Sequence, residues 1–257
     1  MTVPDAGKRQ GANLAFAYVT TLFFAWGFAT SLIDPLIAAV KRVFALNNAE
    51  AFLTTFAWFI AYGLMSLPAA SVLSKLGYSR SIIGALIVMV AGCLIVPAAT
   101  AADWYPGVLI ALFVIASGVT LLQVAANPLV AELGSPKGAS SRLNLSQAFN
   151  SLGTTVGPWL GSHVLLTGGV FAAGAVVTAA TRSQSLRSID MAFLGMGAFF
   201  ALVAIFIFTA RKKINAASPA TTQAVSPLKA LSSPWAIFGA LAIFLYVGSE
   251  VAIGGML

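Results

Sequence analysis

Seven stretches of this chain contain no Asp, Glu, Lys or Arg, and each is long enough to form a helix that crosses a lipid bilayer. They cover residues 10–33, 51–74, 81–102, 104–131, 143–181, 191–210 and 230–249. A membrane-spanning helix needs about 20 mostly apolar residues at a rise of about 1.5 Å each. Only 8% of the residues are charged and the mean hydropathy is +0.94, whereas a soluble domain has about 25% charged residues. The sequence therefore predicts an all-α membrane protein.

The positions of the basic residues indicate how these helices are oriented. Cytoplasmic loops of membrane proteins carry an excess of Lys and Arg. With a cytoplasmic N-terminus, four basic residues fall outside: Lys41, Arg42, Arg182 and Arg187. The others fall on the cytoplasmic side: Lys8, Arg9, Lys75, Arg80, Lys137, Arg142, Arg211, Lys212, Lys213 and Lys229. We therefore expect the N-terminus in the cytoplasm, and we interpret the net charge of +7 as a topology signal rather than as nucleic-acid binding.

The order of apolar and polar segments predicts four regions. Residues 1–11 form a cytoplasmic tail, and residues 12–213 form a six-helix transmembrane bundle with helices at roughly 12–40, 51–74, 80–101, 106–131, 143–168 and 190–210. We expect the run Arg211-Lys212-Lys213 to end the sixth helix at the cytoplasmic face. A polar linker follows at 214–233, and a seventh helix occupies 234–257. This layout is typical of half of a larger transporter, truncated after the start of its second half.

Asp34 is the most costly residue of the first helix, because a charged side chain at a helix centre in lipid costs roughly 2.5–3.5 kcal/mol or more. It precedes Pro35 in the segment 33–38 (IDPLIA), and Asn127 precedes Pro128 in the segment 126–131 (ANPLVA). The first and fourth helices run in opposite directions, as the matching helices of an inverted three-helix repeat do. We interpret Asp34 as functional; the alternative is that it lies near the helix end and reaches water.

Each of these prolines leaves the carbonyl four residues earlier without its helical donor. Those carbonyls belong to Ser31 and Val124, and we expect them to face the interior of the bundle or a cavity. The alternative is that the prolines only bend the helices for packing.

Amide side chains gather on the fourth and fifth predicted helices. Residues four apart share a helix face, and amides inside a membrane either join helices or bind a polar ligand. Each amide offers donors and an acceptor, which suits sugar hydroxyls. An aromatic ring near the middle of the first helix could stack on a sugar. The candidate substrate-binding residues are Gln123, Asn127, Gln147, Asn150, Trp26 and Ser31.

The remaining reactive residues indicate no enzyme and no metal site. Cys93 and His163 are the only residues of their types and lie far apart in the chain. We expect Asp103 and Asp190 in loops, away from Asp34. The glycines of the segment 153–161 have the spacing of closely packed membrane helices, and we predict a packing role for them.

Three segments resemble the fucose–galactose–glucose:proton symporter family of the major facilitator superfamily. They are 23–36 (FFAWGF followed by LIDPL), 122–153 (LQVAANPLV followed by RLNLSQAFNSLG) and 246–254 (YVGSEVAIG). The resemblance covers nearly the whole chain. It implies a major facilitator fold, in which this chain is the N-terminal six-helix bundle, made of two inverted three-helix repeats, plus the start of helix seven of a twelve-helix transporter.

The same resemblance implies a proton-coupled sugar symporter of the bacterial inner membrane that works by alternating access, with Asp34 as the protonatable carboxylate. Fucose transporters of the family carry a second carboxylate where this chain has Gln123, and glucose/galactose-type members carry Gln there. This favours glucose or galactose. The expected partners are a small-molecule sugar, a proton and the lipid bilayer, with no cofactor and no nucleic acid, and we expect a monomer. The alternatives are L-fucose symport, drug–proton antiport and a non-transporting membrane sensor.

Overall fold

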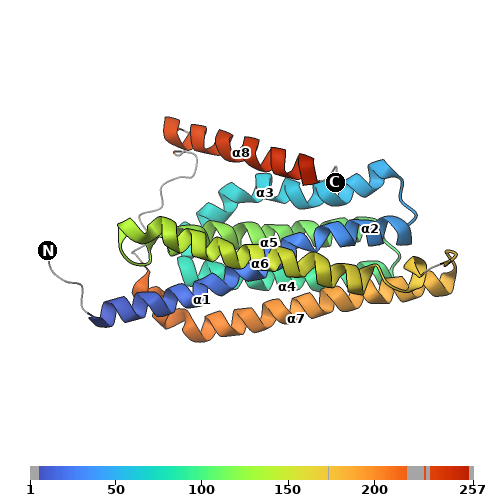
Figure 1. Cartoon of the computed structure of the whole chain (residues 1–257), viewed down its shortest axis with the longest axis horizontal. Helices are drawn as coiled ribbons and strands as arrows, with labels where there is room; N and C mark the ends of the chain where they lie inside the picture. The colour runs from blue at the N-terminus through green and yellow to red at the C-terminus, as the bar shows by residue number, and fades with distance from the viewer. Residues whose placement is uncertain (1–5, 173, 219–228, 230–231, 255–257) are drawn as a thin grey trace. The chain divides into compact units, whose positions relative to one another are not determined.

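The computed structural model of the chain describes residues 6–172, 174–218, 229 and 232–254. The side chains of residues 6–10, 33, 34 and 250–254 lie outside the described part. The chain divides into two compact units, Met1–Thr221 and Thr222–Leu257. The first unit contains the helices α1 to α7, and the second contains α8, Pro234–Gly254 (Figure 1).

The regular structure of the described residues is helical. The helices of the first unit are α1 (Ala6–Ser31), α2 (Ile33–Val43), α3 (Asn48–Leu76), α4 (Tyr78–Ala101), α5 (Tyr105–Glu132), α6 (Ala139–Leu165) and α7 (Ala179–Ala217). Two short 3-10 helices, η1 (Pro136–Gly138) and η2 (Gly169–Phe171), lie in the connections before and after α6. Figure 1 shows the helices of this unit with their long axes roughly along one direction, and α2 continues the line of α1.

The first predicted helix, at 12–40, is wrong as a single element. Helix already begins at Ala6, and it breaks at Leu32 into α1 and α2. Pro35 has no N–H to donate to the carbonyl of Ser31, and its ring displaces that carbonyl. The helical hydrogen bonds resume from Leu36 N to Leu32 O at 3.1 Å. Asp34 is therefore the second residue of a separate half-helix.

The sixth predicted helix, at 190–210, is longer at both ends. Thr178 caps the start of α7 through a reciprocal pair of hydrogen bonds with Thr181, at 2.9 and 3.3 Å. The 39 residues of α7 span about 58 Å at a rise of 1.5 Å, well beyond a hydrocarbon core of about 30 Å. The basic run at 211–213 consequently lies inside α7 and does not end it. Asp190 lies in this helix, and its expected position in a loop is wrong.

Five stretches are long and apolar enough to cross a membrane, judged by length and composition. They are Gly11–Val43, Asn48–Leu76, Tyr78–Ala101, Tyr105–Glu132 and Ala179–Ala217. The fifth predicted helix forms as α6, but among the described residues it does not pass this test. Its amides, hydroxyls and glycines make α6 the most polar long helix of the first unit.

Helix α5 occupies the centre of the first unit. It packs on α3, α4 and α6, while α4 also packs on α7 and α1 packs on α6 and α7. The side chains of Leu112, Ile115, Leu122 and Leu129 on α5 are all fully buried. Because lipid is as apolar as these side chains, close van der Waals contact rather than water exclusion stabilises such helix pairs.

Three glycines let α6 lie directly on α1 and on the start of α2. A β-carbon at Gly153 would lie 2.5 Å from Phe24 O, one at Gly157 would overlap Ser31 Oγ, and one at Gly161 would lie 2.8 Å from Leu32 Cδ2. Small residues four apart allow two membrane helices to approach closely. The predicted packing role of this glycine segment is confirmed.

Candidate functional site

Polar side chains from α1, α3 and α5 meet around the hydroxyl group of Tyr62. This hydroxyl lies beside the side chains of Thr30, Trp58 and Gln123. Trp58 and Tyr62 are four residues apart on α3 and share one face. Thr30 Oγ1 donates to Trp26 O at 2.8 Å, within its own helix. We call Thr30, Trp58, Tyr62 and Gln123 the Tyr62 cluster.

Two buried polar atoms in this region have no hydrogen-bond partner within the described part of the chain. They are Trp58 Nε1, in a side chain that is 1% exposed, and Asn127 Oδ1, one turn beyond Gln123 on α5. Ser81 Oγ on α4 is a third such atom. An unsatisfied buried polar atom costs about 1–3 kcal/mol, and a bound water or ligand is a common explanation. An amide acceptor such as Asn127 Oδ1 is the kind of group that a hydroxylated ligand satisfies.

The predicted residues Asn150 and Ser31 join α6 to α1. Asn150 Nδ2 donates to Phe23 O at 3.2 Å. Ser31 Oγ donates to Phe28 O at 3.1 Å and approaches Gly153 O at 3.5 Å. Both side chains therefore stabilise the helix pair. Their predicted contact with a ligand stays a prediction.

Trp26 lies in the core rather than on a cavity wall. It is 4% exposed, and its ring lies 4.1 Å from the ring of Phe23, centroid to centroid. A sugar needs one open face of a ring to stack on, and this ring is almost completely covered. The stacking of a sugar on Trp26 therefore stays a prediction.

Gln147 belongs to an exposed polar stripe along α6. The stripe lies on a different side of the helix from the glycines that pack on α1, as the 3.6-residue period requires. Polar groups on a membrane helix usually face the interior of a bundle or a water-filled cavity. The members of the stripe are all exposed: Asn144, Gln147, Ser151, Thr154 and Thr155. Gln147 thus differs from the half-buried Asn150, which contacts α1, although the two are only three residues apart.

For Asp34, the candidate proton carrier, the structure describes the position of the backbone only. It lies in the first turn of α2, and its side chain is outside the described residues. Its predicted role therefore stays a prediction.

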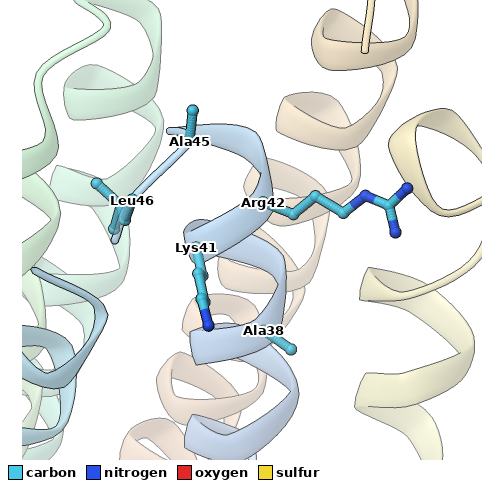
Figure 2. A pocket seen from close by; sticks show the side chains of 5 residues that line it. All are labelled: Ala38, Lys41, Arg42, Ala45 and Leu46. Carbon is cyan, nitrogen blue, oxygen red and sulfur yellow. The ribbon is translucent and has the colours of Figure 1, made fainter. Parts of the chain in front are cut away.

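The opposite end of α2 lines an open pocket of about 530 Å³ with Ala38, Lys41, Arg42, Ala45 and Leu46 (Figure 2). The two basic side chains point apart (Figure 2). Lys41 Nζ donates to Asn48 Oδ1 at 2.6 Å, and the Arg42 guanidinium stands 5.3 Å from the ring centre of Phe171. Both also lie in the last turn of α2, where cations stabilise the helix dipole. Each basic group therefore already has a role in the fold.

Acidic residues near this end of the first unit are bound to neighbouring helices. Arg182 on α7 forms an ion pair with Asp103 between α4 and α5, and its Nε donates to Val43 O at 2.8 Å. The hydrogen bond from Arg182 holds the pKa of the Asp103 carboxyl below its ordinary value. Thr100 Oγ1 donates to Asp190 Oδ1 at 2.6 Å. In the described residues, no group of His, Cys, Asp and Glu could hold a metal ion.

Sequence analysis found the amides but not the cluster around Tyr62. The hydroxyl of Tyr62 meets Thr30 and Gln123 only through contacts between three helices, whereas helical periodicity assigns residues to the faces of a single helix. The spacing of Trp58 and Tyr62 on one helix was the available signal, and it does not distinguish a polar cluster from ordinary aromatic packing.

Comparison with known proteins gives the family. The model of the Major Facilitator Superfamily matches residues 19–257. Over 98% of its length the chain is 40% identical to a glucose/galactose transporter of Brucella abortus biovar 1 (strain 9-941), and it covers 60% of that protein. Over 97% of its length it is 38% identical to a putative glucose/galactose transporter of Helicobacter pylori (strain ATCC 700392 / 26695), again covering 60%. The chain thus spans about 60% of the length of these relatives.

A solved structure agrees with this result. The chain is similar to a crystal structure of FucP, the fucose:proton symporter of Escherichia coli, with a TM-score of 0.66 and 26% identity over 90% of this chain and 56% of that one. The predicted all-α major facilitator fold and the predicted resemblance to these transporters are confirmed. The protein is a multi-pass membrane protein of a transporter family and not an enzyme. The family model covers nearly all of the chain, and the chain belongs to the Major Facilitator Superfamily.

Proposed function

We propose that this protein binds a hexose of the glucose/galactose type and carries it across the bacterial inner membrane together with a proton, by alternating access. The observation that carries the proposal is the position of Gln123 beside the Tyr62 hydroxyl, one helical turn before Asn127, whose buried Oδ1 has no partner in the described part of the chain. A few convergent polar groups within apolar walls are typical of a small-molecule site. The names of the relatives support the substrate class, and the fucose:proton symporter supports proton coupling.

The proposed sugar site is centred on α5. Gln123 and Asn127 offer amide donors and acceptors one turn apart, and Asn127 Oδ1 is buried without a partner in the described part of the chain. Gln147 extends the polar surface along α6. Ser31, Asn150 and Trp26 are proposed at its edge. Ser31 and Asn150 also join α1 to α6.

Proton coupling is assigned to Asp34. It lies where the first membrane span breaks into two helices, so a change in its charge acts on a separate half-helix. We also propose a cytoplasmic N-terminus, with the tail, bundle, linker and seventh helix at 1–11, 12–213, 214–233 and 234–257.

Hexose counterflow in proteoliposomes tests the proposal. Vesicles loaded with unlabelled glucose take up labelled glucose from outside if the protein exchanges the sugar. We expect saturable exchange in the unaltered protein. Gln123→Ala should reduce it at least tenfold, because the substitution leaves a sugar hydroxyl in the site without its hydrogen-bond partner. Asn215→Ala is the matched control, since it removes an exposed amide near the end of α7.

Because the chain spans about 60% of its relatives' length, hexose binding by the 257-residue chain in nanodiscs is measured separately from exchange. No binding and no exchange would overturn the proposal. Uptake of lipophilic cations in place of hexose would instead identify a drug–proton antiporter. Hexose binding without exchange would overturn transport by the 257-residue chain on its own.

A further inference from the structure

Trp58 Nε1 is a buried hydrogen-bond donor within the Tyr62 cluster. The Trp58 side chain is 1% exposed, so its N–H cannot reach a ligand directly. The Tyr62 hydroxyl lies beside it, yet Nε1 makes no hydrogen bond within the described part of the chain. This orphaned donor beside a hydroxyl group leaves one hydrogen bond unmade in this conformation.

Tyr62 differs from Trp58 because it is only half-buried. A phenol hydroxyl donates one hydrogen bond and accepts others. If its oxygen accepts from Trp58 Nε1, its own proton is free to donate to a further acceptor. The acceptor sites that α1 and α5 offer nearby are Thr30 Oγ1, which already donates to Trp26 O at 2.8 Å, and the Gln123 amide.

We infer that Tyr62 is a specificity-determining residue of the proposed sugar site, and that it donates its hydroxyl proton to one hydroxyl oxygen of the hexose beside Gln123. Trp58 is a positioning residue that holds the Tyr62 oxygen by donating from Nε1 in the sugar-bound state. Binding of the sugar therefore forms two hydrogen bonds, one from the Tyr62 hydroxyl to the sugar and one from Trp58 Nε1 to the Tyr62 oxygen. This inference rests on the proposed function, because it requires a hexose at Gln123.

A series of deoxy sugars tests the inference. Glucose and its 2-, 3-, 4- and 6-deoxy analogues are titrated against the chain in nanodiscs, with the unaltered protein and Tyr62→Phe. A neutral hydrogen bond accounts for a factor of about three to ten in affinity. We expect Tyr62→Phe to weaken glucose by this factor and to leave one analogue unaffected, because that analogue lacks the hydroxyl that Tyr62 contacts. Tyr18→Phe is the control, since Tyr18 is also half-buried but packs on Phe206 at 4.8 Å.

Trp58→Phe tests the positioning role. We expect Trp58→Phe to weaken the binding of the same sugars as Tyr62→Phe, by a smaller factor. The double variant should bind no more weakly than Tyr62→Phe alone, because the effects of two groups that act through each other are not additive. Trp159→Phe is the control, because Trp159 is 63% exposed on α6. Thermal unfolding midpoints are measured for each variant, and Trp58→Phe alone carries the test if Tyr62→Phe does not fold.

The outcomes separate this inference from the proposed function. If Tyr62→Phe loses the same affinity for glucose and for all deoxy analogues, Tyr62 contacts no particular hydroxyl of the sugar. That result would overturn this inference but not the proposed function. Additive effects of the two substitutions would overturn the positioning role of Trp58. A failure of the unaltered protein to bind any hexose would overturn the proposed function as well.

Discussion

Gly157 of α6 lies so close to Ser31 of α1 that a β-carbon at Gly157 would overlap Ser31 Oγ. Ser31 is the last residue of α1, immediately before the break at Leu32. The same pair of helices is joined by the hydrogen bond from Asn150 Nδ2 to Phe23 O. Helix α6 therefore fixes the position of the break, and with it the start of the half-helix that carries Asp34.

Gly157→Ala should weaken this helix pair. Overfilling a closely packed contact costs about 1–3 kcal/mol, and the neighbouring atoms include the Phe28 carbonyl, which belongs to the α1 backbone and cannot rotate away. The measurement is thermal unfolding in detergent, followed by tryptophan fluorescence. Gly195→Ala is the control, because a β-carbon there meets no atom within 4 Å. Equal midpoints for both variants would contradict the close contact.

Arg142 should be required for the end of α5. Its guanidinium donates to Val130 O at 3.0 Å, to Ala131 O at 2.5 Å and to Ser135 O at 3.1 Å. These include carbonyls of the last turn, which lack helical partners. We expect Arg142→Ala to lower the free energy of unfolding by about 2–3 kcal/mol, and Arg142→Lys to restore little because ammonium lacks the planar fork.

Unfolding of the Arg142 variants by denaturant gives this free energy directly. Lys137→Ala is the matched control, since Lys137 is an exposed basic residue in the same connection. Full recovery in Arg142→Lys would show that charge alone is needed, and the three directed hydrogen bonds would then be unnecessary.

The Arg182–Asp103 pair should stabilise the protein in a pH-dependent way. The pKa of Asp103 is lowered in the folded state by its hydrogen bond from Arg182. A lowered folded-state pKa gives stability that is present above the ordinary Asp pKa and is lost as the pH falls through the lowered value. Asp103→Asn should therefore lower the unfolding midpoint slightly at pH 7 and not at all at strongly acidic pH.

Asn is chosen at position 103 because the backbone there has a φ of 51°, which Asn tolerates better than most residues. The difference in unfolding midpoint between the unaltered protein and Asp103→Asn should also shrink in high salt, since the ion pair is exposed. In an Arg182→Gln background the substitution should have no effect. A difference that persists in that background would assign the effect to another contact of Asp103.

The order of the helical segments was predictable because a charge-free run of about 20 residues or more satisfies its own backbone in lipid by forming a helix. The break at Leu32 was not predictable from Pro35 alone. Pro128 occupies the same place in the repeated pattern, yet α5 continues through it. The difference depends on what packs beside each proline, and a sequence pattern does not contain that contact.

The length of α7 was misjudged for a related reason. Charged residues usually lie in loops between membrane helices, but Arg182 and Asp190 have partners on α2 and α4 that make a helical position favourable. For the candidate site, the amides of α5 and α6 were predictable from composition and spacing. Whether each amide faces a neighbouring helix, as Asn150 does, or an open surface, as Gln147 does, follows only from the packing of α1 on the α6 glycines.

Asp34→Asn should abolish uphill accumulation of hexose and preserve exchange. In exchange, the binding site carries a sugar in both directions, so no net movement of protons is needed. Accumulation, in contrast, needs a group that takes up a proton on one side of the membrane and releases it on the other. One charge crossing 100 mV supplies about 2.3 kcal/mol, which supports roughly fiftyfold accumulation. We expect the variant to reach equal sugar concentrations inside and outside proteoliposomes, with normal counterflow. Asp103→Asn, at an exposed carboxylate between α4 and α5, should accumulate normally, and undiminished accumulation by Asp34→Asn would remove Asp34 from proton coupling.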